Sequence, residues 1–214
     1  MNILKKRTTF WDLFSDKKNF THPVPVTEFK KLLSPKNRIL DYGCGYGRAI
    51  SELSSAGFDN IFGVDISEKM VTRCQLYNPG AGLLIFDGLS LPFPDQSFNA
   101  CLFMAVLNCI PSDNDQKKAA AEILRVMKPG GILFISDYPI QEDSRNQKRY
   151  LQFRDEFESF GMFRINDGAV FRHSDIQRIY RLFSRFKLIT ESHVEVLTMN
   201  GNPADIYQIL ARKK

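Results

Sequence analysis

The sequence lacks any long run of apolar residues. No stretch approaches the roughly 18 to 20 apolar residues that a membrane-spanning helix needs, so no membrane partner is expected. No apolar stretch follows the basic residues of segment 1–7 either, which argues against a secretory signal. Cysteines are few and scattered, without a metal-type Cys-x-x-Cys pair: Cys44, Cys74, Cys101 and Cys109. Reduced thiols, a cytoplasmic location and no metal site are therefore expected.

The composition is that of an ordinary globular domain. The 214 residues are 43% hydrophobic and 25% charged, so one α/β domain with a sizeable core fits the length. The net charge is +5, and residues 145–187 alone carry ten Lys or Arg against five Asp or Glu. Such a segment can attract an anionic substrate or nucleic acid, or it can be a solvated helix face with interleaved charges. Composition alone therefore does not decide whether this segment binds an anionic substrate, binds nucleic acid or is only a solvated surface.

Apolar runs alternate with helical patterns in the order that βαβ units require. Strands are predicted at 38–42, 60–65, 83–87, 98–107 and 132–137. Helices are predicted at 48–56, from the cap Ser67 to about 76, and at 116–127. The segment before the first strand, residues 1–36, carries helical patterns only.

The pattern changes after the fifth strand. Residues 145–160 have the spacing of an amphipathic helix, and Asp167-Gly168 marks a hairpin. Ser174 can cap a further helix that ends near Phe183. Two long β patterns close the chain, at 186–199 and 204–212.

These patterns predict an α/β fold with a doubly wound, Rossmann-like mixed sheet. Five parallel strands would be joined by a C-terminal antiparallel strand pair. The chain, 1–214, is predicted to be a single domain. Residues 1–36 would form N-terminal lid helices, and 139–184 would form an insertion on the substrate side.

A glycine-rich turn follows the first predicted strand. Asp41 leads into Tyr42-Gly43-Cys44-Gly45-Tyr46-Gly47, where glycines let the backbone turn tightly and approach a ligand without Cβ clashes. Asp65 ends the next strand, 20 residues after Gly45, where a carboxylate can accept both ribose hydroxyls. A pyrophosphate site usually has Gly-x-Gly-x-x-Gly, and Asp41 would repel a diphosphate. The same carboxylate suits the ammonium of S-adenosylmethionine (SAM), so the turn favours SAM over a dinucleotide.

With this turn, the sequence resembles class I SAM-dependent methyltransferases of the small-molecule type. Four segments carry the resemblance in the right order: Ile39–Arg48, Gly63–Met70, Asp87–Asn99 and Glu122–Gly131. They fall within residues 38–138. The resemblance implies a transferase that takes a methyl group from S-adenosyl-L-methionine and releases S-adenosyl-L-homocysteine.

The resemblance also implies roles for residues at the methionine and ribose end of SAM. Gly43 and Gly45 would bring backbone against the methionyl part, with Asp41 near its ammonium. Asp65 would hold the ribose. A strand-end Asp such as Asp65 can alternatively be only a helix cap.

Further roles are implied at the adenine and sulfonium. Ile66 would pack on adenine, Asp87 would accept from its amino group, and Gly88 would supply adjacent backbone. Met104 and Ala105 would border the sulfonium, although plain core packing also explains Ile66 and Met104. Three neighbours complete the expected cofactor-binding set: Cys44, Met70 and Leu89.

The methyl acceptor is less clearly indicated. The Asn/Asp-Pro-Pro-aromatic sequence typical of exocyclic-amine methylation is missing, because Ala105-Val106-Leu107-Asn108 stands in its place. No Pro-Cys pair marks a cytosine enzyme, since Cys109-Ile110-Pro111 has the wrong order. No separate nucleic-acid module is visible. A small-molecule partner is therefore predicted rather than nucleic acid, and the sequence does not indicate an oligomeric state.

Two aromatic-rich segments are expected to close the acceptor pocket, namely Phe10–Phe14 with Phe20, and the insertion. The expected acceptor contacts are Trp11, Arg154, Arg172 and His173, and the expected catalytic residues are His173, Tyr150 and Arg172. Arg154 and Arg172 could orient an anionic acceptor, and His173 could be a base. His22 and His193 are expected to have structural roles and no part in the site.

Two other functions remain open from the sequence. The chain could methylate RNA or protein through the basic segment 145–187. It could also be a SAM-binding regulator that has lost catalysis, because binding alone would keep the same cofactor motifs.

Overall fold

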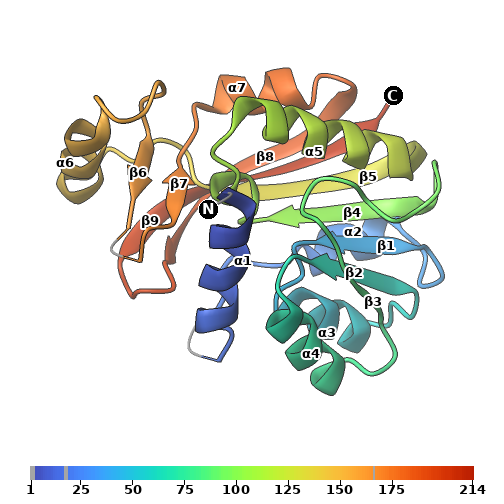
Figure 1. The fold of residues 1–214 in the computed structure, drawn as a ribbon. Coiled ribbons are helices and arrows are strands. Elements are labelled where there is room, and N and C mark those ends of the chain that lie inside the picture. Colours follow the sequence, from blue (N-terminus) through green and yellow to red (C-terminus); the bar gives the residue numbers. More distant parts are fainter. Residues whose placement is uncertain (1–2, 17–18, 166) are drawn as a thin grey trace.

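The computed structural model describes residues 3–16, 19–165 and 167–214. These residues form a seven-stranded sheet with helices on both faces and a separate two-stranded hairpin (Figure 1). Residues 1–2 and 17–18 of the predicted lid lie outside the described residues. No helix in the described part of the chain is long and apolar enough to cross a membrane.

The sheet has the strand order β3-β2-β1-β4-β5-β9-β8. The first five strands are parallel, whereas β9 runs antiparallel to both β5 and β8. The strands of this sheet are β1 (Ile39–Tyr42), β2 (Ile61–Asp65), β3 (Gly82–Ile85), β4 (Phe98–Met104), β5 (Met127–Asp137), β8 (Phe186–Leu197) and β9 (Pro203–Lys213). The predicted doubly wound mixed sheet is confirmed.

Helices follow the strands as the periodicity predicts. The helices are α1 (Ile3–Phe14), α2 (Val26–Leu32), α3 (Arg48–Ser55), α4 (Glu68–Tyr77), the 3₁₀ turn η1 (Leu107–Cys109), α5 (Asp113–Val126), α6 (Ser144–Phe153) and α7 (Ile176–Leu182). Ser67 caps α4 as expected, because its hydroxyl accepts from the Met70 amide at 3.1 Å. Ser112 caps α5 in the same way, so this helix begins earlier than predicted.

The sheet is buried on both faces. Side chains of β4 alternate, with Cys101 and Phe103 packing toward α5 and α7, and Ala100 and Leu102 packing toward α2 and α3. All four are fully buried. Burial on both faces explains why the sequence of this strand is a continuous apolar run rather than an alternating one.

Two parallel strands end sooner than predicted. β3 stops at Ile85, so Asp87 lies in the following loop. β4 stops at Met104 rather than at Leu107, because Ala105 has a φ of 53° and the chain then turns into η1. A positive φ is rare for a residue with a side chain, and such conformations cluster at functional sites.

The insertion after β5 contains α6, the hairpin β6 (Met162–Arg164) with β7 (Val170–Arg172), and α7. The predicted hairpin is therefore confirmed. The predicted helix 145–160 is too long, because α6 ends at Phe153. The expected Ser174 cap is also wrong. Asp175 caps α7 through the Gln177 amide at 3.0 Å, while Ser174 pairs with the strand-like Pro139.

Helix α1 stands apart from both helical layers. Figure 1 shows it running across the end of the sheet at which β4 terminates, between the β6–β7 hairpin and α4. It contacts α4, and the Phe10 ring lies 5.8 Å from the Phe171 ring of β7. The N-terminal segment therefore covers the edge of the sheet where parallel folds bind ligands.

Candidate functional site

A pocket lies at this edge of the sheet, beneath α1. Ten of the residues predicted to bind the cofactor line it: Asp41, Gly43, Cys44, Gly45, Asp65, Ile66, Met70, Gly88, Met104 and Ala105. Asp87 and Leu89 are not part of the lining. The Asp87 carboxylate instead accepts from the amides of Leu89 and Ser90, at 2.8 and 2.7 Å, and closes the loop after β3.

Asp65 braces the glycine-rich turn. One carboxylate oxygen accepts from the Gly45 amide at 2.9 Å, and the other accepts from the Ser67 amide at 2.9 Å. An ionised carboxylate has about four acceptor positions, so it can accept more hydrogen bonds than those from these two amides. Asp65 therefore both holds the turn in shape and faces the pocket.

Glycine is required at two positions of the turn. A Cβ on Gly43 would lie 2.4 Å from the Val106 side chain. Gly45 has a φ of +54°, and a Cβ there would lie 2.2 Å from the Phe20 ring. The turn is thus closed against the chain that follows β4 on one side and against the N-terminal segment on the other.

Asp41 is a buried carboxylate at the pocket wall. Burial raises its pKa to about 7, and the charge of Asp65 adds to this, while Arg48 opposes it. A cationic ligand beside Asp41 would favour the ionised form and lower the pKa again. The pocket therefore offers a site where an ammonium group is preferred over an anion.

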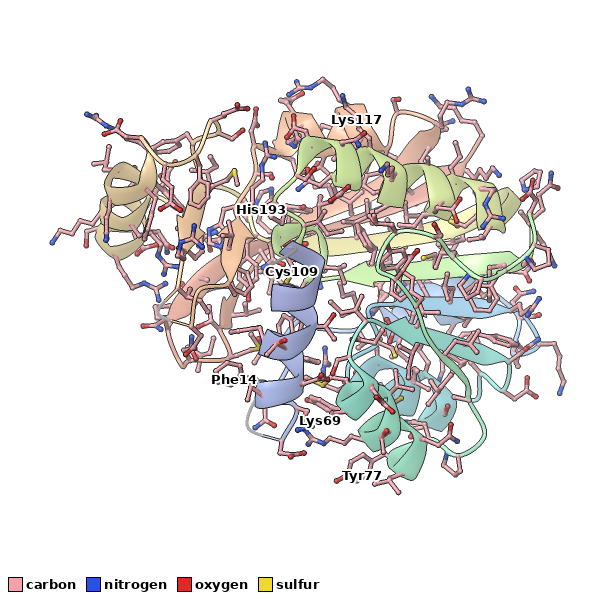
Figure 2. The ribbon with its side chains drawn as sticks, viewed as in Figure 1. Phe14, Lys69, Tyr77, Cys109, Lys117 and His193 are labelled. Carbon is pink, nitrogen blue, oxygen red and sulfur yellow. The ribbon has the colours of Figure 1, made fainter. Side chains whose placement is uncertain are left out.

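Polar contacts attach the N-terminal segment to the cofactor side of the pocket. The Ser67 hydroxyl donates to Asp12 of α1 at 2.5 Å, and the Arg73 guanidinium donates to the Ser15 carbonyl. Figure 2 shows Phe14 on α1 and Lys69 on α4 in the region where the two helices meet. These contacts hold α1 against the start of α4, where its Trp11 lines the pocket.

The chain after α1 is fixed on the glycine-rich turn. The Phe20 amide donates to the Tyr46 hydroxyl at 3.1 Å, and the two rings stack with centroids 4.9 Å apart. The Arg73 guanidinium lies 4.3 Å from the Tyr46 ring centroid. Local patterning gave no signal for these contacts, because they join segments that are distant in the sequence.

The other half of the pocket is aromatic and apolar. Trp11 and Phe20 come from the N-terminal segment, Phe171 from the insertion, Tyr138 from the end of β5, and Met199 from the turn between β8 and β9. Both segments that were predicted to close the acceptor pocket thus contribute to the lining. Tyr138 and Met199 were not among the predicted site residues.

Tyr150 and His173 lie behind this wall rather than in the lining. The Tyr150 hydroxyl is 2.6 Å from His173 Nδ1, and the His173 ring stacks on Tyr138 at 5.2 Å. Burial raises the pKa of Tyr150 to about 12 and lowers that of His173 to about 3. In this structure the pair supports Tyr138 from behind, and the catalytic roles expected for the two residues stay predictions.

The two arginines expected at the acceptor also have other partners. Arg172 is buried, forms an ion pair with Asp113, and donates to the Pro111 carbonyl at 3.0 Å and to Ser159 at 3.1 Å. Arg154 is exposed and pairs with Asp155. Neither side chain belongs to the pocket lining.

His22 is a lining residue that the sequence analysis assigned to structure. Its Nδ1 lies 2.9 Å from the Ser136 hydroxyl, and its ring packs edge-on against Tyr138 at 4.9 Å. Its Nε2 is buried and has no hydrogen-bond partner among the described residues. Burial and the charge of Arg48 lower its pKa to about 4. A lone histidine carries no distinguishing local pattern, so no signal in the sequence marked it.

The chain matches a known family through the segment that builds the cofactor side of this pocket. The family described as "Methyltransferase domain" matches residues 40–135, which run from β1 to β5. Over this segment, just under half of the chain, the sequence matches the methyltransferase domain that the resemblance predicted. The family uses SAM as its methyl donor, so the predicted resemblance and cofactor are confirmed.

Curated relatives of this methyltransferase domain act on different acceptors. An *Arabidopsis thaliana* tRNA (carboxymethyluridine(34)-5-O)-methyltransferase is 32% identical over 118 residues, which cover 55% of this chain and 28% of that protein. A *Synechocystis* 2-methyl-6-phytyl-1,4-hydroquinone methyltransferase is 32% identical over 135 residues, covering 62% and 42%. The chain thus spans less than half the length of either relative.

Solved structures support the fold of the methyltransferase domain and of its additions. A SAM-dependent methyltransferase from *Methanosarcina mazei* superposes with a TM-score of 0.81 at 24% identity, covering 89% of this chain and 98% of the other. A protein solved in a study of echinomycin biosynthesis gives 0.70 at 16% identity, covering 97% and 92%. At these identities the likeness concerns the fold alone.

Proposed function

We propose that this chain transfers a methyl group from SAM to a small-molecule acceptor and releases S-adenosyl-L-homocysteine. One observation carries the proposal: a single pocket joins the cofactor-type residues of the methyltransferase domain to an aromatic wall beneath α1. Methyl transfer is a displacement that depends on alignment and on exclusion of water. A lid over an aromatic pocket supplies both for a ligand of limited size.

The proposed cofactor site keeps the predicted roles. Asp41 would face the ammonium, the backbone of Gly43 and Gly45 would border the methionyl part, and Asp65 would accept from the ribose. Ile66 would pack on adenine. Met104, with Ala105 in its unusual conformation, would lie next to the sulfonium at the end of β4.

The acceptor is proposed to bind mainly through apolar contacts. In the described lining the only Lys or Arg is Arg48, which already lies beside Asp41 and pairs with Glu52. The lining thus offers little to the anionic acceptor that the sequence suggested. The *Synechocystis* relative is named for a hydroquinone, a ring compound for which an aromatic wall is suitable.

RNA is the second candidate acceptor, and the *Arabidopsis* tRNA relative favours it. The basic segment 145–187 gives it little support. Five of its eight arginines lie next to carboxylates, which compete with phosphate: Arg145–Asp143, Arg154–Asp155, Arg164–Glu156, Arg172–Asp113 and Arg178–Asp113. A protein acceptor would meet the same partly neutralised surface.

A screen with radiolabelled SAM tests the proposal. Purified protein is incubated with a metabolite extract, with total RNA and with a protein fraction in parallel, and Asp65→Ala serves as the inactive control. We expect label in the small-molecule fraction only, and only with the wild type. Label confined to RNA or protein would contradict the small-molecule acceptor. SAM binding without labelling of any fraction would instead indicate the non-catalytic SAM-binding protein.

A cytoplasmic location is part of this proposal. Its support is that four cysteines are buried and form no disulfide with one another: Cys44, Cys74, Cys101 and Cys109. Buried thiols outside disulfides are ordinary in a reducing compartment. Cell fractionation followed by immunodetection would test the location directly.

A further inference from the structure

His22, a residue of the wall of the proposed acceptor site, has a ring nitrogen without a hydrogen-bond partner among the described residues. The residue lines the pocket together with Trp11, Tyr138 and Phe171. Only 4% of its surface is exposed, and no described residue bonds its Nε2. Buried polar atoms in folded proteins almost always have a partner, so an unpartnered nitrogen on a pocket-lining residue calls for an explanation, and a ligand contact is one.

The other ring nitrogen determines what Nε2 can do. Nδ1 lies 2.9 Å from the Ser136 hydroxyl oxygen, which can accept a hydrogen bond from a protonated Nδ1. In that tautomer Nε2 of the neutral ring has a free lone pair. Nε2 then accepts a hydrogen bond and does not donate one.

Neighbouring polar groups of the pocket are less suited to this task. The Asn108 amide oxygen already accepts from the Cys109 thiol at 3.1 Å. Burial raises the pKa of the Tyr138 hydroxyl well above its usual range, so this group keeps its proton. His22 therefore supplies the neutral nitrogen acceptor on this wall.

We propose that Nε2 of His22 accepts a hydrogen bond from a hydroxyl group of the acceptor, and that this hydroxyl oxygen receives the methyl group. The inference rests on the proposed function and deepens it. It assigns the acceptor to alcohols or phenols with an apolar body. A carboxylate or a thiolate has no proton to donate to Nε2.

The reaction balances with this one base. The hydroxyl oxygen forms a bond to the methyl carbon, while the carbon–sulfur bond breaks and its electron pair stays on sulfur as a thioether. The hydroxyl proton passes to Nε2, and the imidazolium then returns it to water. An oxygen that has gained a methyl group and kept its proton is a far stronger acid than any imidazolium. Proton transfer is therefore downhill even for a histidine of low pKa.

The first test identifies the atom that is methylated. Wild-type protein is incubated with ¹³C-methyl SAM and metabolite extract, and the chemical shift of the labelled methyl group is read by proton–carbon correlation. We expect a methyl ether that resists mild alkali. A methyl group on carbon, nitrogen or sulfur, or an alkali-labile ester, would overturn the inference while leaving small-molecule methylation intact. If no small molecule is labelled, the proposed function fails and this inference fails with it.

The second test uses variants of His22, with ¹³C-methyl SAM as the donor and the same metabolite extract as the source of the acceptor. His22→Phe keeps a flat ring against Tyr138 but has no lone pair, so turnover should fall about 100-fold or more. His22→Gln offers an amide oxygen and should recover part of that loss. SAM affinity by calorimetry should stay within about twofold in both, as expected for a group that contacts the acceptor and not the cofactor. His193→Gln is the matched control, because His193 is exposed on β8 and pairs only with Glu191 among the described residues.

The results separate catalysis from structure. Unchanged turnover of His22→Phe would overturn the inference. If His22→Phe does not fold, His22→Gln decides. A fall in its SAM affinity equal to the fall in its turnover would assign His22 to the fold. Lower turnover with unchanged SAM affinity, together with an ether product, would support the proposed contact.

Discussion

The Ser67 hydroxyl joins two parts of the site. It accepts from the Met70 amide at 3.1 Å, which caps α4, and it donates to Asp12 on α1 at 2.5 Å. Its own amide donates to Asp65. One residue therefore connects α1, the start of α4 and the carboxylate that braces the glycine-rich turn. The position of α1 and the shape of the glycine-rich turn are consequently coupled.

Removing the Asp12 contact should loosen the lid without unfolding the chain. A hydrogen bond to a charged group contributes about 1.5–3 kcal/mol, so Asp12→Ala should speed SAM dissociation by roughly tenfold or more. Surface plasmon resonance measures that rate. Asp16→Ala is the control, because Asp16 is exposed and lies just beyond the same helix. Equal dissociation rates in the two variants would show that the contact does not hold the lid.

Asp65→Ala should weaken SAM binding for two reasons. It removes the proposed bonds to ribose, each contributing about 1.5–3 kcal/mol, and it releases the Gly45 amide that the carboxylate holds. We expect the dissociation constant, measured by calorimetry, to rise about 100-fold. Asp59→Ala breaks only an exposed pair with Lys36 and should leave binding unchanged. An unaltered SAM dissociation constant for Asp65→Ala would show that Asp65 acts only as a helix cap.

Asp41 should make the free energy of unfolding depend on pH, because the carboxylate proposed to bind SAM is buried. Its pKa is about 7 in the folded chain against 3.8 for the free side chain. Between these values the folded state holds a proton that the unfolded state has lost, so stability falls as pH rises through this window and levels off above 7.

Asparagine does not titrate, and Asp41→Asn therefore removes this contribution. The variant should be more stable than the wild type at pH 8 by about 2–4 kcal/mol, with little difference at low pH, while binding SAM more weakly. Urea unfolding at both pH values, in the absence of ligand, measures the effect. A wild type that is the more stable protein at pH 8 would contradict the assignment.

Replacing Arg172 should affect the fold before it affects the acceptor. The side chain ties β7 to the start of α5 through Asp113, Pro111 and Ser159. Arg172→Gln should lower the free energy of unfolding by about 1–3 kcal/mol, because buried partners lose their bonds. Thermal unfolding checks this, and Arg154→Gln is the exposed control. A raised acceptor KM in a fully stable Arg172→Gln would restore the acceptor role expected from the sequence.

The parts of the site that the sequence revealed are local. Gly43, Gly45 and Asp65 belong to strand–turn–helix units in which residue type and spacing fix the conformation, and all three line the pocket. The insertion shows why other residues were missed. Successive residues of a strand face opposite sides, and in β7 it is Phe171 that reaches the pocket while Arg172 points to α5.

Choosing between those two faces required knowing which side of the hairpin faces the pocket, and residue type alone does not determine this. His22 and Met199 were missed for a related reason. Both reach the pocket through segments that are placed by tertiary contacts, the Phe20–Tyr46 stack for one and the β8–β9 pairing for the other. The prediction therefore chose Arg172 as an acceptor contact, whereas its neighbour Phe171 is the residue that lines the pocket.

The packing of Phe20 against Gly45 and of α1 across the pocket has a kinetic consequence. Ligands buried under a lid enter and leave only as fast as the lid opens, and release often limits turnover in such enzymes. We therefore expect the departure of the spent thioether, rather than the displacement at carbon, to be the slowest step. Each cycle would then require α1 to detach from α4, and the strength of that attachment would set the balance between retaining SAM and turning over quickly.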